Sequence, residues 1–214
     1  MRRTLVAIIA GLALLIGAMP SAADAAASGW KIYSYAPSGR TLSSKQAPAG
    51  DGSIAEFTFL PTPDDALLAM KASGAPDSSI FEKTITATFT IECVGTCTFI
   101  YYGEDTDPCG TPASVRLYFN TANGPFAYTK YWWSNPDAAV LTGPGTGELT
   151  AKVDPAVWSD WNGQYGTTDP VAFEDAASNP DLIGLSFGGG CFFENGVGVD
   201  PGSATFKLIS FDID

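Results

Sequence analysis

The chain has 214 residues, of which 45% are hydrophobic and 16% are charged, and its formal net charge is -12. Such an acidic surface repels phosphate groups, so we expect neither a nucleic acid nor an anionic lipid surface as a partner. The sequence contains no histidine, which excludes a Ser-His-Asp triad, a Cys-His dyad and any metal site built on histidine. A nucleophile in this chain would have to rely on a carboxylate or a lysine as its base.

The first 25 residues have the pattern of a cleavable signal peptide. Two arginines follow Met1, and the apolar run Leu5–Ile16 is short for a helix that spans a bilayer. The tripeptide Ala23-Asp24-Ala25 has the small-x-small pattern that signal peptidases cleave. We therefore expect residues 1–25 to be removed, leaving a secreted or periplasmic protein without a membrane span. A retained membrane anchor is the alternative, but Pro20 follows the apolar run where an anchor would continue.

Four cysteines, an even number, agree with export to an oxidising compartment and predict two disulfides. Cys93 directly follows the predicted strand Thr84–Glu92, in phase with its apolar face. A three-residue turn separates it from Cys97, which begins a predicted returning strand with Phe99 and Tyr101. We therefore expect a hairpin closed by a Cys93–Cys97 disulfide. Cys109 and Cys191 then pair by elimination. A zinc site is the alternative, and the wide separation of these last two cysteines speaks against it.

Alternation of apolar and polar residues predicts strands along most of the chain. Turn sequences such as Gly143-Pro144-Gly145 separate them. The last strand changes phase near Leu208, which indicates a bulge or a strand covered on both faces. The expected strands are Ile54–Leu60, Thr84–Glu92, Ser114–Asn120, Phe126–Trp133, Glu148–Val153, Leu182–Phe187 and Ala204–Ile213.

Two short helices are also expected. Thr62-Pro63-Asp64-Asp65 is a favourable helix start before Ala66–Lys71. Val171–Ala177 is the second helix, ended by Asn179-Pro180. Many short strands with Gly/Pro turns and little helix predict an all-β sandwich or barrel. No internal repeat or linker is visible, so we expect residues 26–214 to form a single β-sandwich domain.

The order of features in residues 147–214 adds a family resemblance. A strand is followed by Asp154-Pro155-Ala156-Val157-Trp158, then by Trp161-Asn162-Gly163, a helix around Phe173, the segment Leu182–Gly188, a glycine loop and a closing strand. This order resembles the C-terminal half of galactose-binding-like jelly rolls, which occur in carbohydrate-binding modules and in secreted bacterial proteins. The chain ends in Phe211-Asp212-Ile213-Asp214, where such modules often have an Asp-Asp or Asp-Asn dipeptide. The resemblance implies a jelly-roll β-sandwich that binds carbohydrate, and it transfers no ligand residue by position.

Aromatic residues concentrate in the second half of the chain. Sugars stack their C–H faces on such rings while nearby polar side chains bind the hydroxyls. Neighbouring residues of a strand point to opposite faces, so one of Trp132 and Trp133 belongs to the core and the other to the outer face or under a loop. The same holds for Phe192 and Phe193. For Trp158 we favour a place in the core.

One strand face is the predicted ligand site. Arg116, Tyr118 and Asn120 share the face opposite the core-facing residues of their strand. With Tyr128 and with Trp132 or Trp133 they would bind a sugar by hydrogen bonds and ring stacking. A ladder of cross-strand pairs on an exposed sheet needs the same residue types and is the alternative. In that case the site lies elsewhere, and the loop at 191–199 is the next choice.

Carboxylates offer two further hypotheses. Glu104, Asp105 and Asp107 are candidate calcium ligands, with a solvated acidic loop as the alternative; no other cofactor is expected. Glu194 is the best single candidate for a catalytic acid, since its aromatic and disulfide neighbours would raise its pKa. A glycosidase needs two carboxylates, and no partner for Glu194 is evident. We therefore assign no catalytic residue.

Three functions from different classes follow. The leading hypothesis is a secreted, non-catalytic module that binds an extracellular glycan. The second is a glycan-active hydrolase or lyase, and the third is an extracellular structural or surface protein without a small ligand. A strip of exposed aromatic rings would favour the binding module. A groove that holds two close carboxylates would favour the hydrolase or lyase, and a convex face without pockets would favour the structural protein.

Overall fold

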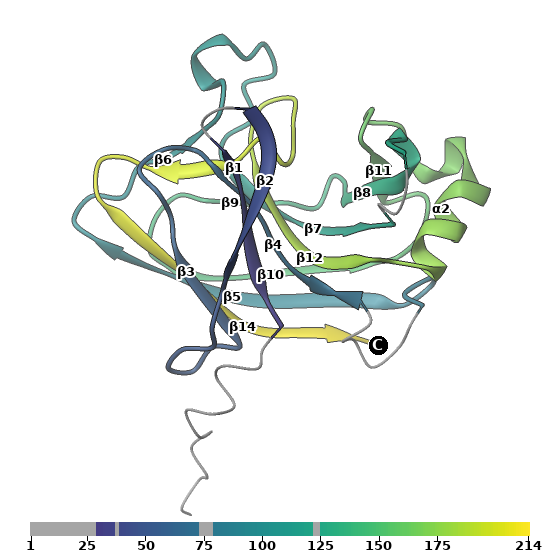
Figure 1. The fold of residues 1–214 in the computed structure, drawn as a ribbon, viewed down its shortest axis with the longest axis horizontal. Coiled ribbons are helices and arrows are strands. Elements are labelled where there is room, and N and C mark those ends of the chain that lie inside the picture. The colour runs from purple at the N-terminus through teal and green to yellow at the C-terminus, as the bar shows by residue number, and fades with distance from the viewer. Residues whose placement is uncertain (1–28, 37–38, 73–78, 122–124) are drawn as a thin grey trace, which may run out of the picture.

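The computed structural model describes residues 29–36, 39–72, 79–121 and 125–214, which form two packed antiparallel sheets (Figure 1). The prediction of an all-β sandwich is thereby confirmed. The predicted signal peptide, residues 1–25, lies outside the described residues. Within the described part of the chain, no helix is long and apolar enough to cross a membrane.

The larger sheet has ten strands and carries the candidate site. Its main path runs β11-β8-β7-β12-β4-β1-β2, with β13 paired to β4 and β6, and β9 paired to β7. The strands are β1 (Lys31–Ala36), β2 (Gly39–Gln46), β4 (Asp65–Lys71), β6 (Phe99–Tyr101), β7 (Ser114–Asn120), β8 (Tyr131–Ser134), β9 (Ala139–Val140), β11 (Trp158–Asp160), β12 (Leu182–Gly188) and β13 (Val197–Val199).

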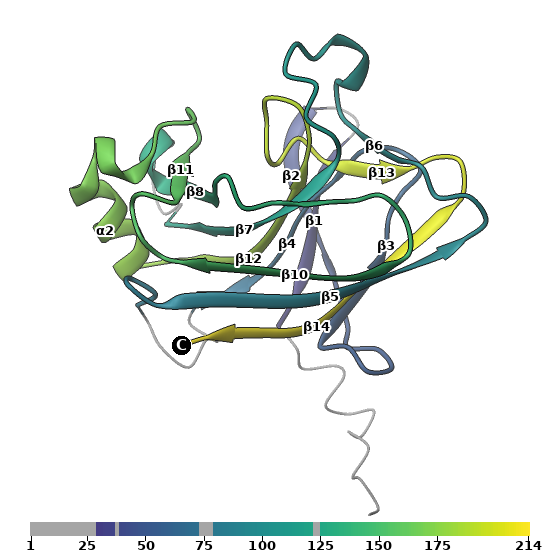
Figure 2. The same cartoon turned by 180° about the vertical axis from the view of Figure 1, so that it is seen from behind.

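The smaller sheet has four strands in the order β10-β5-β14-β3 and lies across the sandwich from β7 and β12 (Figure 2). The pairing register of β14 with β5 shifts between Leu208 and Ser210, which confirms the predicted irregularity in the last strand. The strands are β3 (Ala55–Thr58), β5 (Thr84–Val94), β10 (Gly145–Lys152) and β14 (Ser203–Ile213).

The core fills the space between the two sheets. Alternate residues of β5 point inward and are buried, as the sequence pattern predicts. Phe206 of β14 sits among rings from both sheets, with its centroid 4.9 Å from that of Phe89 and 5.1 Å from that of Phe187. Burial of such large rings is the main stabilising contribution to a sandwich of this kind.

One α-helix, α2 (Pro170–Ser178), covers one end of the sandwich (Figure 1) and confirms the predicted helix at 171–177. Asp169 caps it by accepting a hydrogen bond from the Ala172 N–H, and Pro170 occupies its first turn. Phe173 anchors its buried face. The described residues also include the 3-10 turns η2 (Glu104–Thr106), η3 (Tyr128–Lys130) and η4 (Gly166–Thr168).

The other predicted helix, Ala66–Lys71, is wrong, because this segment is strand β4. β4 lies between β12 and β1, and its residues Ala66 to Ala69 are buried on both faces of the sheet. These residues are apolar on both faces, so the sequence of β4 lacks the alternation that distinguishes a strand from a helix.

Two strand assignments also need correction. The segment after Cys97 does not return along β5, because β10 and β14 already occupy both edges of that strand; β6 crosses to the larger sheet and pairs with β13. The predicted strand Phe126–Trp133 is a strand only from Tyr131 onward. Its pairing begins at Tyr131 opposite Asn120, where β7 ends, so the earlier residues have no partner strand and include η3 instead.

Both predicted disulfides are present, Cys93–Cys97 and Cys109–Cys191. The first closes the short loop after β5. The second joins positions that are 82 residues apart. Two disulfides in a chain of this size are typical of extracellular proteins.

Asp65 begins β4 with its carboxylate buried. Its Oδ1 accepts a hydrogen bond from the Ser34 hydroxyl (2.7 Å), and its Oδ2 accepts one from the Leu60 N–H (3.1 Å). Burial raises the pKa of Asp65 above its ordinary value, and the two hydrogen bonds and the charge of Lys45 offset only part of this effect.

We expect the Asp65→Asn variant to gain stability relative to the parent as the pH rises from acid to neutral. Because the folded-state pKa is raised, the stability that the neutral carboxyl contributes is complete below the unfolded pKa of about 3.9 and is lost as the pH rises through the folded pKa. The amide never ionises and keeps an oxygen for the Leu60 N–H. Urea unfolding of both proteins at several pH values measures the difference, and a difference independent of pH would contradict this account.

Candidate functional site

The outer face of the larger sheet carries a second apolar cluster, separate from the core. Its buried members include Leu67, Tyr118, Trp133 and Leu182. Each of these alternates along its strand with a residue of the main core, so the cluster lies on the side of the sheet that faces away from the sandwich interior. Tyr118 and Trp133 are cross-strand partners, with ring centroids 5.3 Å apart.

A cavity of about 670 Å³ opens at one end of this outer face. Its base includes Trp133, and three loops form its walls: residues 102–108, 160–163 and 191–195. Its aromatic residues include two that are exposed, Tyr102 and Phe192. The lining residues are Pro63, Asp64, Tyr102, Gly103, Thr106, Asp107, Pro108, Trp133, Asp160, Trp161, Gly163, Cys191, Phe192, Phe193, Glu194 and Asn195.

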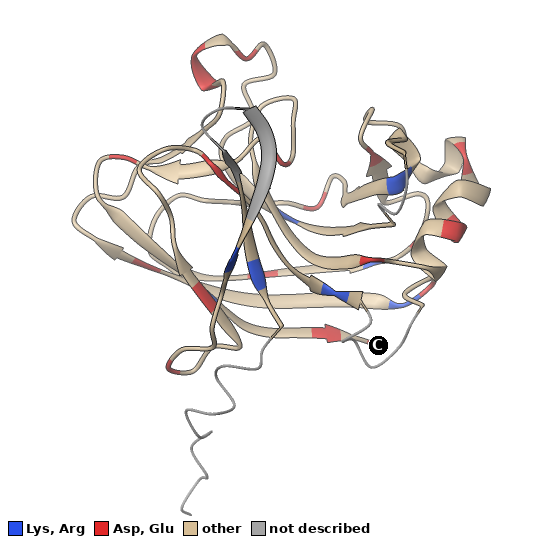
Figure 3. Ribbon diagram, viewed as in Figure 1, with Lys and Arg blue, Asp and Glu red and all other residues tan. Residues whose placement is uncertain are grey.

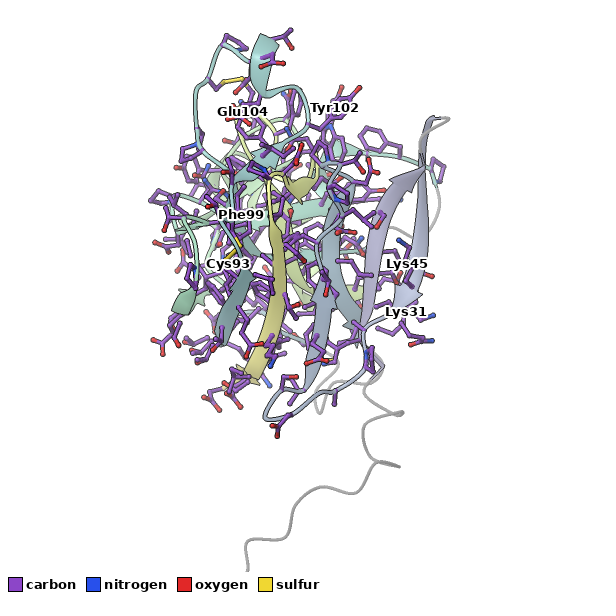
Figure 4. The ribbon with its side chains drawn as sticks, turned by 90° about the vertical axis from the view of Figure 1, so that its left-hand side faces the viewer. Lys31, Lys45, Cys93, Phe99, Tyr102 and Glu104 are labelled. Atoms are coloured by element: carbon purple, nitrogen blue, oxygen red, sulfur yellow. A yellow bond between two sulfur atoms is a disulfide. The ribbon has the colours of Figure 1, made fainter. Side chains whose placement is uncertain are left out.

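Two of the walls are bound to each other. The Cys109–Cys191 disulfide links the loop after β6 to the loop after β12. Asn195 strengthens this link, because its Nδ2 donates to the Tyr102 carbonyl (2.7 Å). In Figure 4, Tyr102 lies on the first of these loops, which projects beyond the ends of the sheets. The two walls therefore keep a defined spacing.

Asp107 organises the same junction. Its carboxylate accepts hydrogen bonds from the backbone N–H groups of Cys109, Gly110 and Cys191 and from the Tyr101 hydroxyl. Desolvation opposes ionisation of this group, but the hydrogen bonds outweigh it and hold the pKa of Asp107 below its usual value. Asp107 is therefore ionised at neutral pH and fixes both loops.

A hydrogen-bonded chain connects the base of the cavity to the third loop. The Trp133 indole Nε1 donates to the Ser186 hydroxyl (2.9 Å), and that hydroxyl donates to the Phe193 carbonyl. Behind Phe193 lies Arg116, whose guanidinium carbon is 3.9 Å from the ring centroid. The backbone and ring of Phe193 are thus both held by residues of the sheet.

Arg116 itself is buried beneath this loop. Its Nη1 donates to the carbonyls of Ser134 (2.9 Å) and Pro136 (3.3 Å). Burial lowers the pKa of Arg116 to about 10, although Asp137 favours the charged form. The guanidinium stays protonated at neutral pH and supports the loop from below.

Asp160 ends β11 and shapes the remaining wall. Its Oδ1 accepts hydrogen bonds from the N–H groups of Asn162 and Gln164, both at 2.9 Å, which bends the chain so that Trp161 is presented beside the cavity. β11 pairs with β8, placing Asp160 opposite Trp132. On the facing loop, Glu194 is only 7% exposed. Burial raises the pKa of Tyr131, and the charge of Glu194 raises it further.

Aromatic rings continue from the cavity to the surface. The outer aromatic cluster consists of Phe126, Tyr128, Tyr131 and Trp161. The Trp161 centroid lies 5.8 Å from that of Trp133 in the cavity and 5.6 Å from that of Phe126. Phe126 and Tyr128 are exposed. A ligand that extends out of the cavity past Trp161 would meet further rings.

The predicted ligand residues are dispersed by the fold. Trp133 lines the cavity, whereas Trp132 is fully buried on the core side and its Nε1 donates to the Thr129 carbonyl. This confirms that the two tryptophans face opposite ways. Tyr128 is exposed in the outer aromatic cluster. The other three residues share a sheet face as predicted, but this face is covered and they are buried: Arg116, Tyr118 and Asn120. Tyr118 and Asn120 bond to each other, because Asn120 Nδ2 donates to the Tyr118 hydroxyl.

The alternative location predicted for the site is the loop at 191–199, and its residues 191–195 line the cavity. The ligand-face prediction did not include Tyr102, Asp160 and Trp161. Asp160-Trp161-Asn162-Gly163 is a typical Asx-turn sequence with an aromatic residue at its tip, and that pattern is the signal that would have identified the last two. Nothing in the sequence distinguishes Tyr102 from a core tyrosine.

The acidic loop that we considered for calcium is η2 and its flanks. Glu104 and Asp105 are exposed, and Figure 4 labels Glu104 on the same projecting loop as Tyr102. Asp107 lies within 4.8 Å of the sulfur atoms of Cys109 and Cys191, but these sulfurs are bonded to each other and offer no thiolate to a metal. Calcium binding here stays a prediction.

No protein-family model matches the sequence, and no curated protein matches it. Among solved structures, the chain is similar to the xylan-binding module CBM15, with 12% identity and a TM-score of 0.39 over 85% of this chain and 92% of that one. It is also similar to Xylanase10C from Cellvibrio japonicus, solved with xylopentaose, with 12% identity and a TM-score of 0.34 over 84% of this chain and 27% of that one. Likenesses this distant assign no ligand.

Proposed function

We propose that this chain is an exported, non-catalytic protein that binds an oligosaccharide in the cavity on the outer face of the larger sheet. The observation that carries the proposal is the composition of that cavity. Aromatic rings from all three loops and the sheet share it with the carboxylates of Asp160 and Glu194. Rings offer stacking surfaces for the C–H faces of sugars, and polar groups between them bind hydroxyls.

The rings of the proposed site are held in place before any ligand arrives. Trp133 is fixed by Ser186, Phe193 by Arg116 and Ser186, and the two outer loops by a disulfide. A site of this kind loses little conformational entropy when a ligand binds. Arg116 and Tyr118 support the site from beneath. For one or two sugar units we expect dissociation constants between about micromolar and millimolar.

Replacing Trp161 tests the proposal, because this ring lies between the cavity and the outer aromatic cluster. We expect Trp161→Ala to weaken binding of any oligosaccharide found on a glycan array by about thirtyfold, since a central tryptophan is worth about 2 kcal/mol or more. Isothermal titration calorimetry measures the change.

Val171→Ala serves as the matched control, because Val171 is exposed on α2 and does not line the cavity. It should bind like the parent. Near-UV circular dichroism verifies that both variants are folded. If folded Trp161→Ala binds as tightly as the parent, the cavity is not the binding site.

A glycan hydrolase is the second candidate, favoured by one observation. Asp160 and Glu194 both line the cavity and are only 6% and 7% exposed, so two nearly buried carboxylates share one site with aromatic rings. The test is release of reducing ends from glycans that bind. Release that is lost in both Asp160→Asn and Glu194→Gln would establish the enzyme and overturn the non-catalytic assignment.

A further inference from the structure

The cavity is strongly acidic. Four carboxylates line it, from Asp64, Asp107, Asp160 and Glu194, and no lysine or arginine is among its lining residues. The red segments of Figure 3 include the loop beyond β6, and Lys31 and Lys45 lie on β1 and β2, away from Tyr102 and Glu104 in Figure 4. A concave site with charges of one sign concentrates its field within the cavity.

Arg116 places a positive charge close to the cavity. It stands behind the Phe193 ring, and its Nη1 is occupied by two backbone carbonyls. Arg116 is not among the residues that line the cavity, so its charge offsets part of the local negative charge from behind the wall. Its neighbour Asp137 opposes it in turn. The balance of charges facing the cavity therefore stays negative.

Asp160 shows where a cationic group would be recognised. The residue is 6% exposed and lines the cavity. The backbone N–H groups of Asn162 and Gln164 both donate to its Oδ1. Within the described chain, its Oδ2 accepts no hydrogen bond. Oδ2 is not among the buried polar atoms that lack a partner in the described residues, so it stays accessible in a residue that lines the cavity. A protonated amine would supply this oxygen with a charge-assisted donor. Trp161, next in the chain, also lines the cavity and presents a ring to which an ammonium group is attracted.

We infer that the cavity selects oligosaccharides that carry protonated amino groups, as chains of glucosamine do, over the same chains with those amines acetylated. The inference rests on the proposed function, because the aromatic rings would stack on the sugar and the carboxylates would favour sugars that carry a positive charge. Acetylation removes the positive charge and keeps the ring for stacking. A uronic acid chain brings like charges into the site and is excluded by repulsion.

Isothermal titration at low salt with three probes tests this: a glucosamine oligosaccharide, its N-acetylated form, and a uronic acid oligosaccharide of equal length. We expect the amine form to bind about tenfold more tightly than the acetylated form and the uronate form not to bind. The preference should shrink at high salt, because screening weakens the attraction.

Two isosteric variants separate a local from a global effect of charge. Asp160→Asn keeps the Oδ1 acceptor for its turn but removes the charge, and we expect it to lower the ratio of amine to acetyl affinity about fivefold. Asp212→Asn makes the same change in net charge at an exposed position on β14, in the other sheet, and should keep the parent ratio.

The outcomes distinguish the two proposals. Binding of the acetylated chain without a preference for the amine, or an equal effect of both variants, overturns the charge selection and leaves the oligosaccharide site intact. If neither these probes nor any glycan on an array binds, both proposals fail. A preference for the amine that only Asp160→Asn reduces supports both.

Discussion

Replacing both Cys109 and Cys191 with alanine is expected to lower the free energy of unfolding by about 4.5 kcal/mol. In the chain-entropy description this is the value of a bond between residues 82 apart. The bond also joins two walls of the cavity, so oligosaccharide binding should be lost before the fold is. Asp107 and Asn195 would still link the loops, but only by hydrogen bonds to groups that the missing bond no longer holds close.

The matched control is the Cys93→Ala, Cys97→Ala double variant. This disulfide joins residues only 4 apart in the sequence. In the same chain-entropy description its removal lowers the free energy of unfolding by about 2 kcal/mol. Urea unfolding of both variants, with binding measured by calorimetry under conditions where each is folded, gives the comparison. An equal loss of stability in both, or normal binding by the first, would show that the long-range bond does not organise the cavity.

The Phe173→Ala variant is expected to lose about 3 to 5 kcal/mol of stability, the usual cost of deleting a fully buried ring. The centroid of Phe173 lies 4.9 Å from that of Trp132 and 5.9 Å from that of Phe119. Without it, α2 has no large side chain anchoring it to the sheet, and the core side of β8 is left unfilled. Thermal or urea unfolding measures the loss.

Val171→Ala on the same helix provides the comparison. Val171 is 78% exposed, so its substitution should change the stability by less than about 0.5 kcal/mol. A loss for Phe173→Ala as small as this would mean that α2 contributes little to the sandwich.

Strands in which polar and apolar residues alternate were predictable from the sequence, because a period of two indicates a strand even where, as in β7, both faces are buried. Ser114–Asn120 matches β7 at both ends, and the outward threonines of β5 pair across the smaller sheet, for example Thr86 with Thr150. The alternation is missing where the residues on both faces are apolar, as in β4. It also says nothing about which strand is the neighbour, so the course of β6 toward β13 was missed.

The candidate site was only partly predictable, for a related reason. The pattern shows that Arg116, Tyr118 and Asn120 share a face, and it cannot show that Phe193 and Trp161 lie over that face. Both covering rings belong to loops whose positions depend on a disulfide and on turns around Asp107 and Asp160. The cysteine pairing brought the right loops together, and the identity of the covering residues required the three-dimensional arrangement.

The five tryptophans of the chain allow the most direct test of the central claim, that the cavity binds the oligosaccharide. Trp133 and Trp161 line the cavity, whereas Trp30, Trp132 and Trp158 belong to the sandwich core. We propose titrating a ¹⁵N-labelled protein with a bound oligosaccharide and following the assigned indole N–H signals by nuclear magnetic resonance. The account predicts that the signals of Trp133 and Trp161 shift while the other three do not. Binding that leaves both cavity signals unchanged would contradict it.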